Sequence, residues 1–329
     1  MKGFHYLALN FNMKQKKSLG QNFLRSPKII SDIIKASLVQ KSDIVLEIGP
    51  GQGILTYALL KTGALVISVE KDDRLIPELK EKFAKEIGTG QLRLIHADIL
   101  NFDMPRVPLD NENISKMSKT AFDTRHPYKI VANIPYYITG QVIRKFLEAK
   151  NQPESMTLLL QKEVAERIVA KPNSRSVAQS AKGGFRAKDE KESLLSLSVK
   201  AFGNAKYIRT VGRGAFSPQP NVDSAILHIS NISRKNFLPS PYVGHRVKED
   251  GNASGSVIDK VGERLFFKIL HAGFAHKRKQ LLPNLSSLYP KSQLVKAFEK
   301  CGIDLKSRAE DIPFETWLKL CGHLISTEL

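Results

Sequence analysis

The segment Asn133-Ile134-Pro135-Tyr136 has the most specific chemistry in this sequence. The Asn133 amide oxygen and a main-chain carbonyl beside Pro135 can both accept hydrogen bonds from one planar NH2 group. The neighbouring Tyr136 ring can stack on the base that bears this group. The combination suits methyl transfer to an exocyclic amine of a nucleobase. Asn and Pro are also common in turns between a strand and a helix, so the segment alone leaves a purely structural role open.

A glycine-rich loop lies upstream, where Gly49, Gly51 and Gly53 follow an apolar run and precede a helical pattern. Glycine permits positive φ angles and the close approach of a ligand to the main chain. Glu70 ends the next apolar run, about 20 positions after Gly49, which is the spacing of a carboxylate that binds ribose hydroxyls in doubly wound folds. These residues predict a nucleoside-containing cofactor, but their spacing does not separate NAD from S-adenosylmethionine.

Two further carboxylates belong to the same predicted cleft. Asp98 follows the third predicted strand. It can accept a hydrogen bond from an adenine amino group, with Ile99 packing near the ring, or it can be an ordinary turn or N-cap residue. Glu47 lies within the first predicted strand. It either holds the glycine loop in place or is simply a polar residue near the strand end.

The segment Phe216-Ser217-Pro218-Gln219-Pro220 lies between two predicted strands near the end of the sheet pattern. An aromatic ring on a proline-stiffened loop can stack on a base that is withdrawn from its helix. The alternative is a packed hairpin loop that binds nothing.

These residues require a sheet whose strands end at a common edge. Apolar runs predict strands, and helical patterns lie between most of them; the strands are at 44–48, 65–69, 92–95, 129–132 and 156–160, and the helices at 54–60, 73–86, 139–149 and 163–170. The alternation predicts a doubly wound, mainly parallel α/β sheet with helices on both faces. Ligands bind at the carboxyl ends of such strands, where the candidate residues would meet. Runs at 205–211 and 222–229 are joined too closely for a crossover helix, and they predict an antiparallel edge hairpin.

Three polar segments interrupt this pattern, at 101–127, 171–192 and 231–259, and we expect surface loops there. The last one is typical of an interdomain linker. Residues 260–329 have a helical pattern with turns at Pro283, Pro290, Gly302 and Pro313. We therefore predict an N-terminal extension at 1–13, an α/β domain at 14–230, a linker at 231–259 and a small all-α C-terminal domain at 260–329.

The formal net charge of +19 over 329 residues indicates a polyanionic partner. The alternative is a basic surface that only keeps the protein in solution. The run Lys277-Arg278-Lys279 is a candidate nucleic-acid contact, although cations also suit a solvated helix end.

The two cysteines, Cys301 and Cys321, have no ligand cluster near them, so we expect neither a structural metal nor a disulfide framework. The chain has no apolar run that would span a bilayer and no cleavable signal pattern, so we expect no membrane partner and a cytoplasmic location.

With Gln21-Asn22-Phe23-Leu24 added, the set of motifs resembles the ribosomal RNA adenine N6-dimethyltransferase family. The resemblance covers residues 14 to about 229 and continues weakly through 260–329. Besides Glu70 and Asp98, the segments that carry it are 21–24, 46–53, 133–136, 161–167 and 216–224.

The resemblance implies a Rossmann-like methyltransferase that uses S-adenosylmethionine and acts as a monomer. Its substrate would be two adjacent adenosines near the 3′ end of 16S rRNA, in the small ribosomal subunit or its precursor. Asn22 and Leu24 would cover one side of the cofactor, and Gly49 would lie near its methionine part. Glu70 would bind the ribose and Asp98 the adenine. Asn133 would touch both the cofactor and the target amine, and Tyr136 and Phe216 would enclose the target adenine.

The sequence departs from the family pattern at two places. The loop before Asn133 is longer than usual, and a Lys/Ser-rich stretch follows Lys171-Pro172 in place of a compact turn. Both departures lie outside the expected methyl-transfer site. A 23S rRNA adenine methyltransferase and a non-catalytic nucleic-acid-binding factor remain the alternatives. Residues 222–224 and the C-terminal basic run favour the small-subunit enzyme, and the intact site motifs argue against lost catalysis. An NAD-dependent oxidoreductase is disfavoured by residues 133–136 and by the charge.

Overall fold

The computed structural model describes residues 21–41, 43–102, 127–170, 191–237, 256–276 and 278–325, without the side chains of 256–261 and 325. The predicted extension at 1–13, Lys277, and most of the predicted loops at 101–127 and 171–192 lie outside the described residues. The chain divides into two compact units. The first holds residues 1–142, 156–161 and 209–226, and the second holds 143–155, 162–208 and 227–329.

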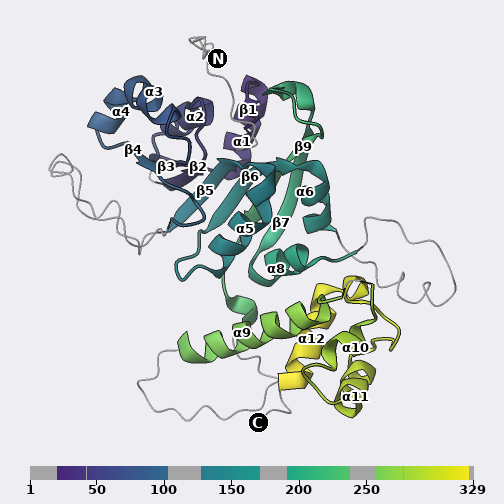
Figure 1. Ribbon diagram of the computed structural model, residues 1–329. Coiled ribbons are helices and arrows are strands. Elements are labelled where there is room, and N and C mark those ends of the chain that lie inside the picture. The colour runs from purple at the N-terminus through teal and green to yellow at the C-terminus, as the bar shows by residue number, and fades with distance from the viewer. Residues whose placement is uncertain are drawn as a thin grey trace. The chain divides into compact units, whose positions relative to one another are not determined.

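A seven-stranded sheet has the strand order β4-β3-β2-β5-β6-β9-β7 (Figure 1). Its strands are β2 (Ile44–Ile48), β3 (Leu65–Glu70), β4 (Leu92–His96), β5 (Tyr128–Asn133), β6 (Ser155–Gln161), β7 (Asn204–Val211) and β9 (Ser224–Ser230). β3 and β5 flank β2, and both pair with it in parallel, while β4 pairs in parallel with β3. All five predicted sheet strands are confirmed, because each lies within the observed one. The predicted edge hairpin is confirmed as β7 and β9.

The strand order reverses between β2 and β5. From β2 the chain passes outward through β3 and β4, and it then returns to β5 on the other side of β2. The register places Ile48 opposite both Val69 and Ala132, so the three central strands end at one edge. In open α/β sheets a ligand crevice forms at such a switch point, outside the carboxyl ends of the strands.

Helices cover this part of the sheet in the first unit. They are α1 (Pro27–Ser37), α2 (Ile54–Lys61), α3 (Leu75–Lys82) and α4 (Ala84–Gly88). α1 packs on α2 and β5, α2 on β3, and α3 and α4 on β4. Every residue of β2 is buried, as expected for a parallel strand covered on both faces. A second, two-stranded sheet pairs β1 (Phe23–Leu24) with β8 (Phe216–Ser217) in antiparallel fashion.

The predicted single helix at 73–86 is wrong, because the structure has two helices that meet at Phe83. Phe83 has φ −113° and ψ 25°, which is not helical. Its side chain is buried, and its ring lies so close to Gly53 that a Cβ on that glycine would be 2.6 Å from Cε2. The packing of this ring beneath the glycine loop accompanies the break in the helix.

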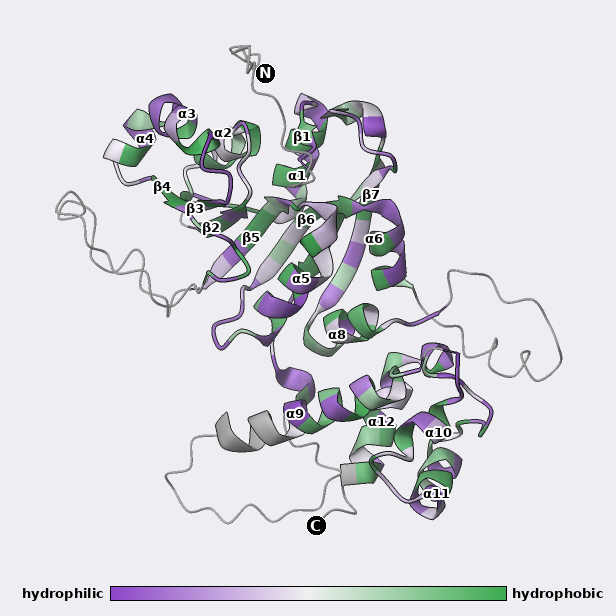
Figure 2. Ribbon diagram, in the orientation of Figure 1, coloured by the Kyte–Doolittle hydropathy of each residue, from purple (hydrophilic) through white to green (hydrophobic). Residues whose placement is uncertain are grey.

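The second unit contains the C-terminal helices. Its elements include α6 (Lys162–Val169), α8 (Leu194–Phe202), η6 (Lys235–Phe237), α9 (Ser256–Gly273), α10 (Leu281–Leu285), α11 (Lys291–Cys301), η7 (Ala309–Asp311) and α12 (Phe314–Ile325), while α5 (Thr139–Glu148) begins in the first unit. Figure 2 shows green and purple residues alternating along α9 and α11, as expected for helices with one buried face. Phe202, Phe237 and Phe267 pack together with ring centroids 5.2–5.9 Å apart. None of the helices within the described ranges is both long and apolar enough to cross a membrane.

The predicted C-terminal turns are confirmed at three of four positions. Pro290 and Pro313 directly precede α11 and α12, and Gly302 ends α11 with φ 65°. Pro283 instead lies inside α10, so the turn predicted there is wrong. A proline is tolerated in the first turn of a helix, where its missing N–H has no helical partner to lose.

Candidate active site

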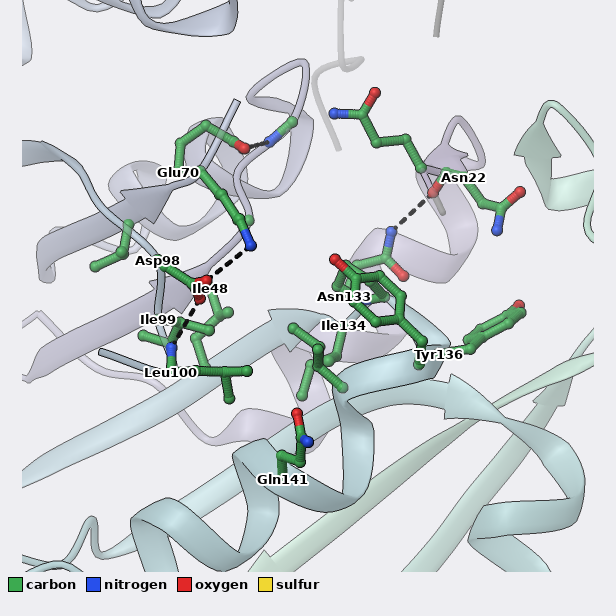
Figure 3. A pocket seen from close by; sticks show the side chains of 18 of the residues that line it. Asn22, Ile48, Glu70, Asp98, Ile99, Leu100, Asn133, Ile134, Tyr136 and Gln141 are labelled. Atoms are coloured by element: carbon green, nitrogen blue, oxygen red, sulfur yellow. Dashed lines mark hydrogen bonds and ion pairs between the residues drawn. The ribbon is translucent and has the colours of Figure 1, made fainter. Parts of the chain in front are cut away.

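A pocket of about 250 Å³ lies at the carboxyl ends of β2, β3 and β5 (Figure 3). Nine of the residues predicted for the site line it: Asn22, Gly49, Gly51, Glu70, Asp98, Ile99, Asn133, Pro135 and Tyr136. Figure 3 shows Glu70, Asp98 and Ile99 on one side and Asn133 and Tyr136 on the other. All the lining residues belong to the first unit.

The glycine loop follows β2 and turns directly into α2. Gly49, Gly51 and Gly53 have φ angles of 67°, 57° and 75°, in the left-handed region that favours glycine. Gly53 is the N-cap of α2 and does not line the pocket. Lys82 donates from Nζ to the carbonyl of Gln52 at 2.8 Å, which braces the loop from the end of α3.

Glu70 is the last residue of β3, and its carboxylate is held by two main-chain donors. Oε2 accepts from the N–H of Gly51 at 3.1 Å, and Oε1 accepts from the N–H of Asp72 at 2.8 Å. Burial raises the pKa of Glu70, and these hydrogen bonds oppose the rise. The carboxylate is therefore fixed against the glycine loop at the wall of the pocket.

Asp98 lies on the same wall, two residues after the end of β4. Its Oδ2 pairs with Nζ of Lys71 at 2.7 Å, and its Oδ1 accepts from the N–H of Leu100 at 3.0 Å. Ile99 is buried beside it. The Leu100 bond is a turn interaction of the kind the structural alternative predicted, yet Asp98 also faces the pocket, so it is placed to serve both purposes.

Glu47 lies outside the pocket, inside β2, and its side chain is completely buried. Its Oε2 accepts from the Ser68 hydroxyl at 2.6 Å. Burial raises the pKa of Glu47 to about 7, and the Ser68 hydrogen bond opposes this rise. The residue is thus a buried strand carboxyl that bonds to the neighbouring strand.

The segment Asn133–Tyr136 begins at the last residue of β5. The Asn133 side chain donates from Nδ2 to the main-chain carbonyl of Asn22 at 3.1 Å. Tyr136 opens the short helix η4 (Tyr136–Ile138), and its hydroxyl shares a 2.7 Å hydrogen bond with that of Ser224. Burial raises the pKa of Tyr136, which keeps the phenol protonated near neutral pH.

Three predicted residues of the first unit are outside the pocket wall: Leu24, Gly53 and Phe216. Phe216 is buried and pairs with Leu24 across the β1–β8 sheet. Its side chain is not among those that line the pocket. Arg278 and Lys279 are exposed in the second unit, and Lys277 lies outside the described residues. Within the described residues, no group of His, Cys, Asp or Glu side chains is suited to hold a metal ion.

Sequence reasoning missed several residues of the pocket wall, among them Gln21, Phe23, Lys71, Tyr137 and Gln141. Phe23 packs against the glycine loop, because a Cβ on Gly51 would be 3.0 Å from its ring. Lys71 and Tyr137 directly follow Glu70 and Tyr136, so adjacency to the motifs was the available signal.

Comparison with known proteins agrees with this geometry. A family model described as ribosomal RNA adenine dimethylase matches residues 12–245. A protein of Dehalococcoides mccartyi named ribosomal RNA small subunit methyltransferase A is 38% identical over 313 residues, which cover 94% of this chain and 89% of that protein. A Clostridium botulinum protein of the same name is 35% identical over 311 residues, or 94% of each chain.

Solved structures show the same fold. A dimethyladenosine transferase from Plasmodium falciparum is 25% identical, with a TM-score of 0.63 over 91% of this chain and 95% of that one. The 23S rRNA methyltransferase ErmE is 24% identical, with a TM-score of 0.60 over 92% of this chain and all of that one. From the extent of the family match and the identity to its relatives, we conclude that the chain belongs to the ribosomal RNA adenine dimethylase family.

Proposed function

We propose that this protein transfers methyl groups from S-adenosylmethionine to the N6 amine of two adjacent adenosines near the 3′ end of 16S rRNA, in the small ribosomal subunit or its precursor. Family membership supports the reaction, rRNA adenine dimethylation. The names of the relatives from D. mccartyi and C. botulinum support the choice of the small subunit. The observation that carries the proposal is the Asn133 amide at the pocket wall, with its nitrogen bound to the Asn22 carbonyl.

The chemistry of the pocket fits S-adenosylmethionine. Two carboxylates, Glu70 and Asp98, line one wall and can accept from ribose hydroxyls and an adenine amine. Ile48, Ile99 and Ile134 add apolar surface for the flat base. Gly49 and Gly51 have no side chains, so a ligand can approach the main chain there. When bound, the cofactor supplies an electrophilic methyl group on a sulfonium.

Asn133 would act by orienting the target amine. A nucleobase NH2 is a poor nucleophile because its lone pair is delocalised into the ring. Hydrogen bonds from its two N–H groups to the Asn133 amide oxygen and to a main-chain carbonyl of the same segment would favour a more tetrahedral nitrogen. Positioning of this kind can lower a barrier by roughly 7–11 kcal/mol. Tyr136 would hold the base by stacking, since its protonated phenol is not suited to act as a base.

The binding partner and the cellular location follow from the same proposal. The charge of +19 favours a polyanion such as RNA, and we place the protein in the cytoplasm as a monomer acting on ribosomal particles. Basic side chains of the C-terminal region, including Arg278 and Lys279, would bind RNA phosphates.

The proposal is tested by incubating the full chain with radiolabelled S-adenosylmethionine and either immature small subunits or large subunits. The rRNA is then digested, and the modified base is identified and mapped by mass spectrometry. N6,N6-dimethyladenosine at two adjacent positions in the small-subunit RNA is the expected result. Label in the large subunit alone would indicate a 23S enzyme, and binding without label would indicate a non-catalytic factor.

A further inference from the structure

We propose that Ser224 is a positioning residue, which holds the Tyr136 side chain in the direction needed for methyl transfer. The inference rests on the proposed function, because it assigns Tyr136 to the target base. Ser224 is the first residue of β9, is fully buried and does not line the pocket. Its hydroxyl oxygen lies 2.7 Å from that of Tyr136, and either group can donate the hydrogen bond between them.

The Tyr136 ring is held at both of its ends. At the main-chain end, η4 is closed by the N–H of Ile138, which donates to the Pro135 carbonyl at 3.2 Å. At the other end, the ring hydroxyl is bonded to Ser224. Rotation about the Cα–Cβ bond would carry the hydroxyl away from this partner, so the bond fixes the direction in which the ring points. Rotation about the Cβ–Cγ bond leaves the hydroxyl oxygen in place, so the bond does not set the plane of the ring.

A stacking role alone does not require the hydroxyl. Every aromatic ring offers a face to a base, so phenylalanine would stack as well as tyrosine. The Tyr136 hydroxyl is bound to a buried side chain. We therefore assign this hydroxyl to holding the ring rather than to contacting the substrate.

The turn before Ser224 ties this anchor to the loop that follows β7. Asp223 accepts from the N–H of Arg213 at 3.2 Å, so the loop from Arg213 to Asp223 is closed at its base. Phe216 lies in that loop, in β8. Ser224 thus attaches the ring of the catalytic segment to the same turn that closes the loop bearing Phe216.

The experiment is a double-mutant cycle on methyl transfer to immature small subunits, with Tyr136→Phe, Ser224→Ala and the double variant. Each single variant should lower kcat about three- to tenfold, the range that corresponds to one neutral hydrogen bond. The double variant should lose no more than the larger single loss, because both changes break the same contact. Cofactor affinity should stay within about twofold, because Glu70 and Asp98 keep their contacts.

The matched control is Ser198→Ala, which removes another buried serine hydroxyl, one that donates to the Leu194 carbonyl within α8. Its kcat should equal that of the parent. Thermal unfolding identifies any variant that has failed to fold. If Ser224→Ala does not fold, the kcat of Tyr136→Phe alone tests the inference. A parent-like kcat for folded Ser224→Ala, or losses that multiply in the double variant, would overturn the inference. An inactive parent would instead count against the proposed function.

Discussion

The side-chain nitrogen of Asn133 donates a hydrogen bond to the main-chain carbonyl of Asn22, 3.1 Å away. These residues are far apart in the sequence, one at the end of β5 and the other just before β1. The bond determines which end of the amide is nitrogen and directs the oxygen to the remaining position, where it can accept from an N–H donor. Asn22 therefore contributes to the site through its main chain as well as through its place in the pocket wall.

The glycine loop depends on the absence of a side chain at Gly53. Gly53→Ala should destabilise the protein and weaken cofactor binding. The left-handed φ of 75° alone costs an L-residue roughly 1–2 kcal/mol. The new Cβ would also lie 2.6 Å from the Phe83 ring. Gly140→Ala in α5 is the control, because a Cβ there meets nothing within 4 Å. Urea denaturation should show a lower free energy of unfolding only for Gly53→Ala. An equal change in this free energy for both variants would refute the role given to Gly53.

Glu70 offers a test of the cofactor site. Glu70→Ala should weaken S-adenosylmethionine binding, because it removes the proposed ribose acceptor and also releases the N–H of Gly51. RNA affinity should remain nearly unchanged, since it depends on contacts between cationic side chains elsewhere and the RNA phosphates. Calorimetry measures the first quantity and filter binding the second. The exposed Glu81→Ala variant controls for the loss of one negative charge. Unchanged cofactor affinity would remove Glu70 from the site.

The buried carboxyl of Glu47 predicts a pH-dependent stability. Burial raises its pKa from 4.5 to about 7, so the native state keeps a proton that the unfolded chain has lost in this range. The protonated carboxyl contributes fully to the free energy of unfolding below pH 4.5, and this contribution disappears as the pH rises through 7. The loss is on the order of 3 kcal/mol. Glu47→Gln cannot lose a proton, so it should gain stability relative to the parent between pH 5 and pH 8. Urea denaturation of both proteins at pH 5 and at pH 8 measures this gain. If the difference in the free energy of unfolding between Glu47→Gln and the parent is the same at both pH values, the raised pKa of Glu47 is contradicted.

The basic run of the second unit predicts a salt effect. Replacing Lys277, Arg278 and Lys279 with Ala should weaken binding to the small subunit and flatten its salt dependence. Each lost phosphate contact lowers the slope by about 0.7–0.9. Lys291, Lys296 and Lys300, exposed on α11, form a matched triple variant in the same unit. Cofactor affinity should not change in either variant. Equal slopes for all three proteins would mean that the run makes no contact with RNA phosphates.

Much of the fold was predictable because its signals are local. Apolar runs bounded by polar residues marked every strand of the large sheet, and the rule that ligands bind where strand order reverses brought Glu70, Asp98 and Asn133 to one pocket. Helices α1 and α8 were left out of the prediction, although α1 has the apolar spacing of an amphipathic helix.

The remainder depends on contacts between distant segments. β1 and β8 have only two residues each, too few to show a period, yet their pairing buries Phe216 against the strand that holds Leu24. The Asn133–Asn22 and Tyr136–Ser224 bonds likewise join segments whose contact no local pattern of residues indicates. Propensity and spacing report on neighbours along the chain, so these features needed the structure.

In the proposed reaction the Asn133 amide orients the target amine. The most direct test of this role is the single-turnover rate of methyl transfer to immature small subunits by Asn133→Ala, measured together with cofactor affinity and with the exposed Asn204→Ala variant as control. We expect a rate about 10²–10³-fold below the parent, the effect of losing one preorganised polar contact, with a much smaller change in cofactor affinity. A folded Asn133→Ala protein that methylates at nearly the parent rate would contradict this role.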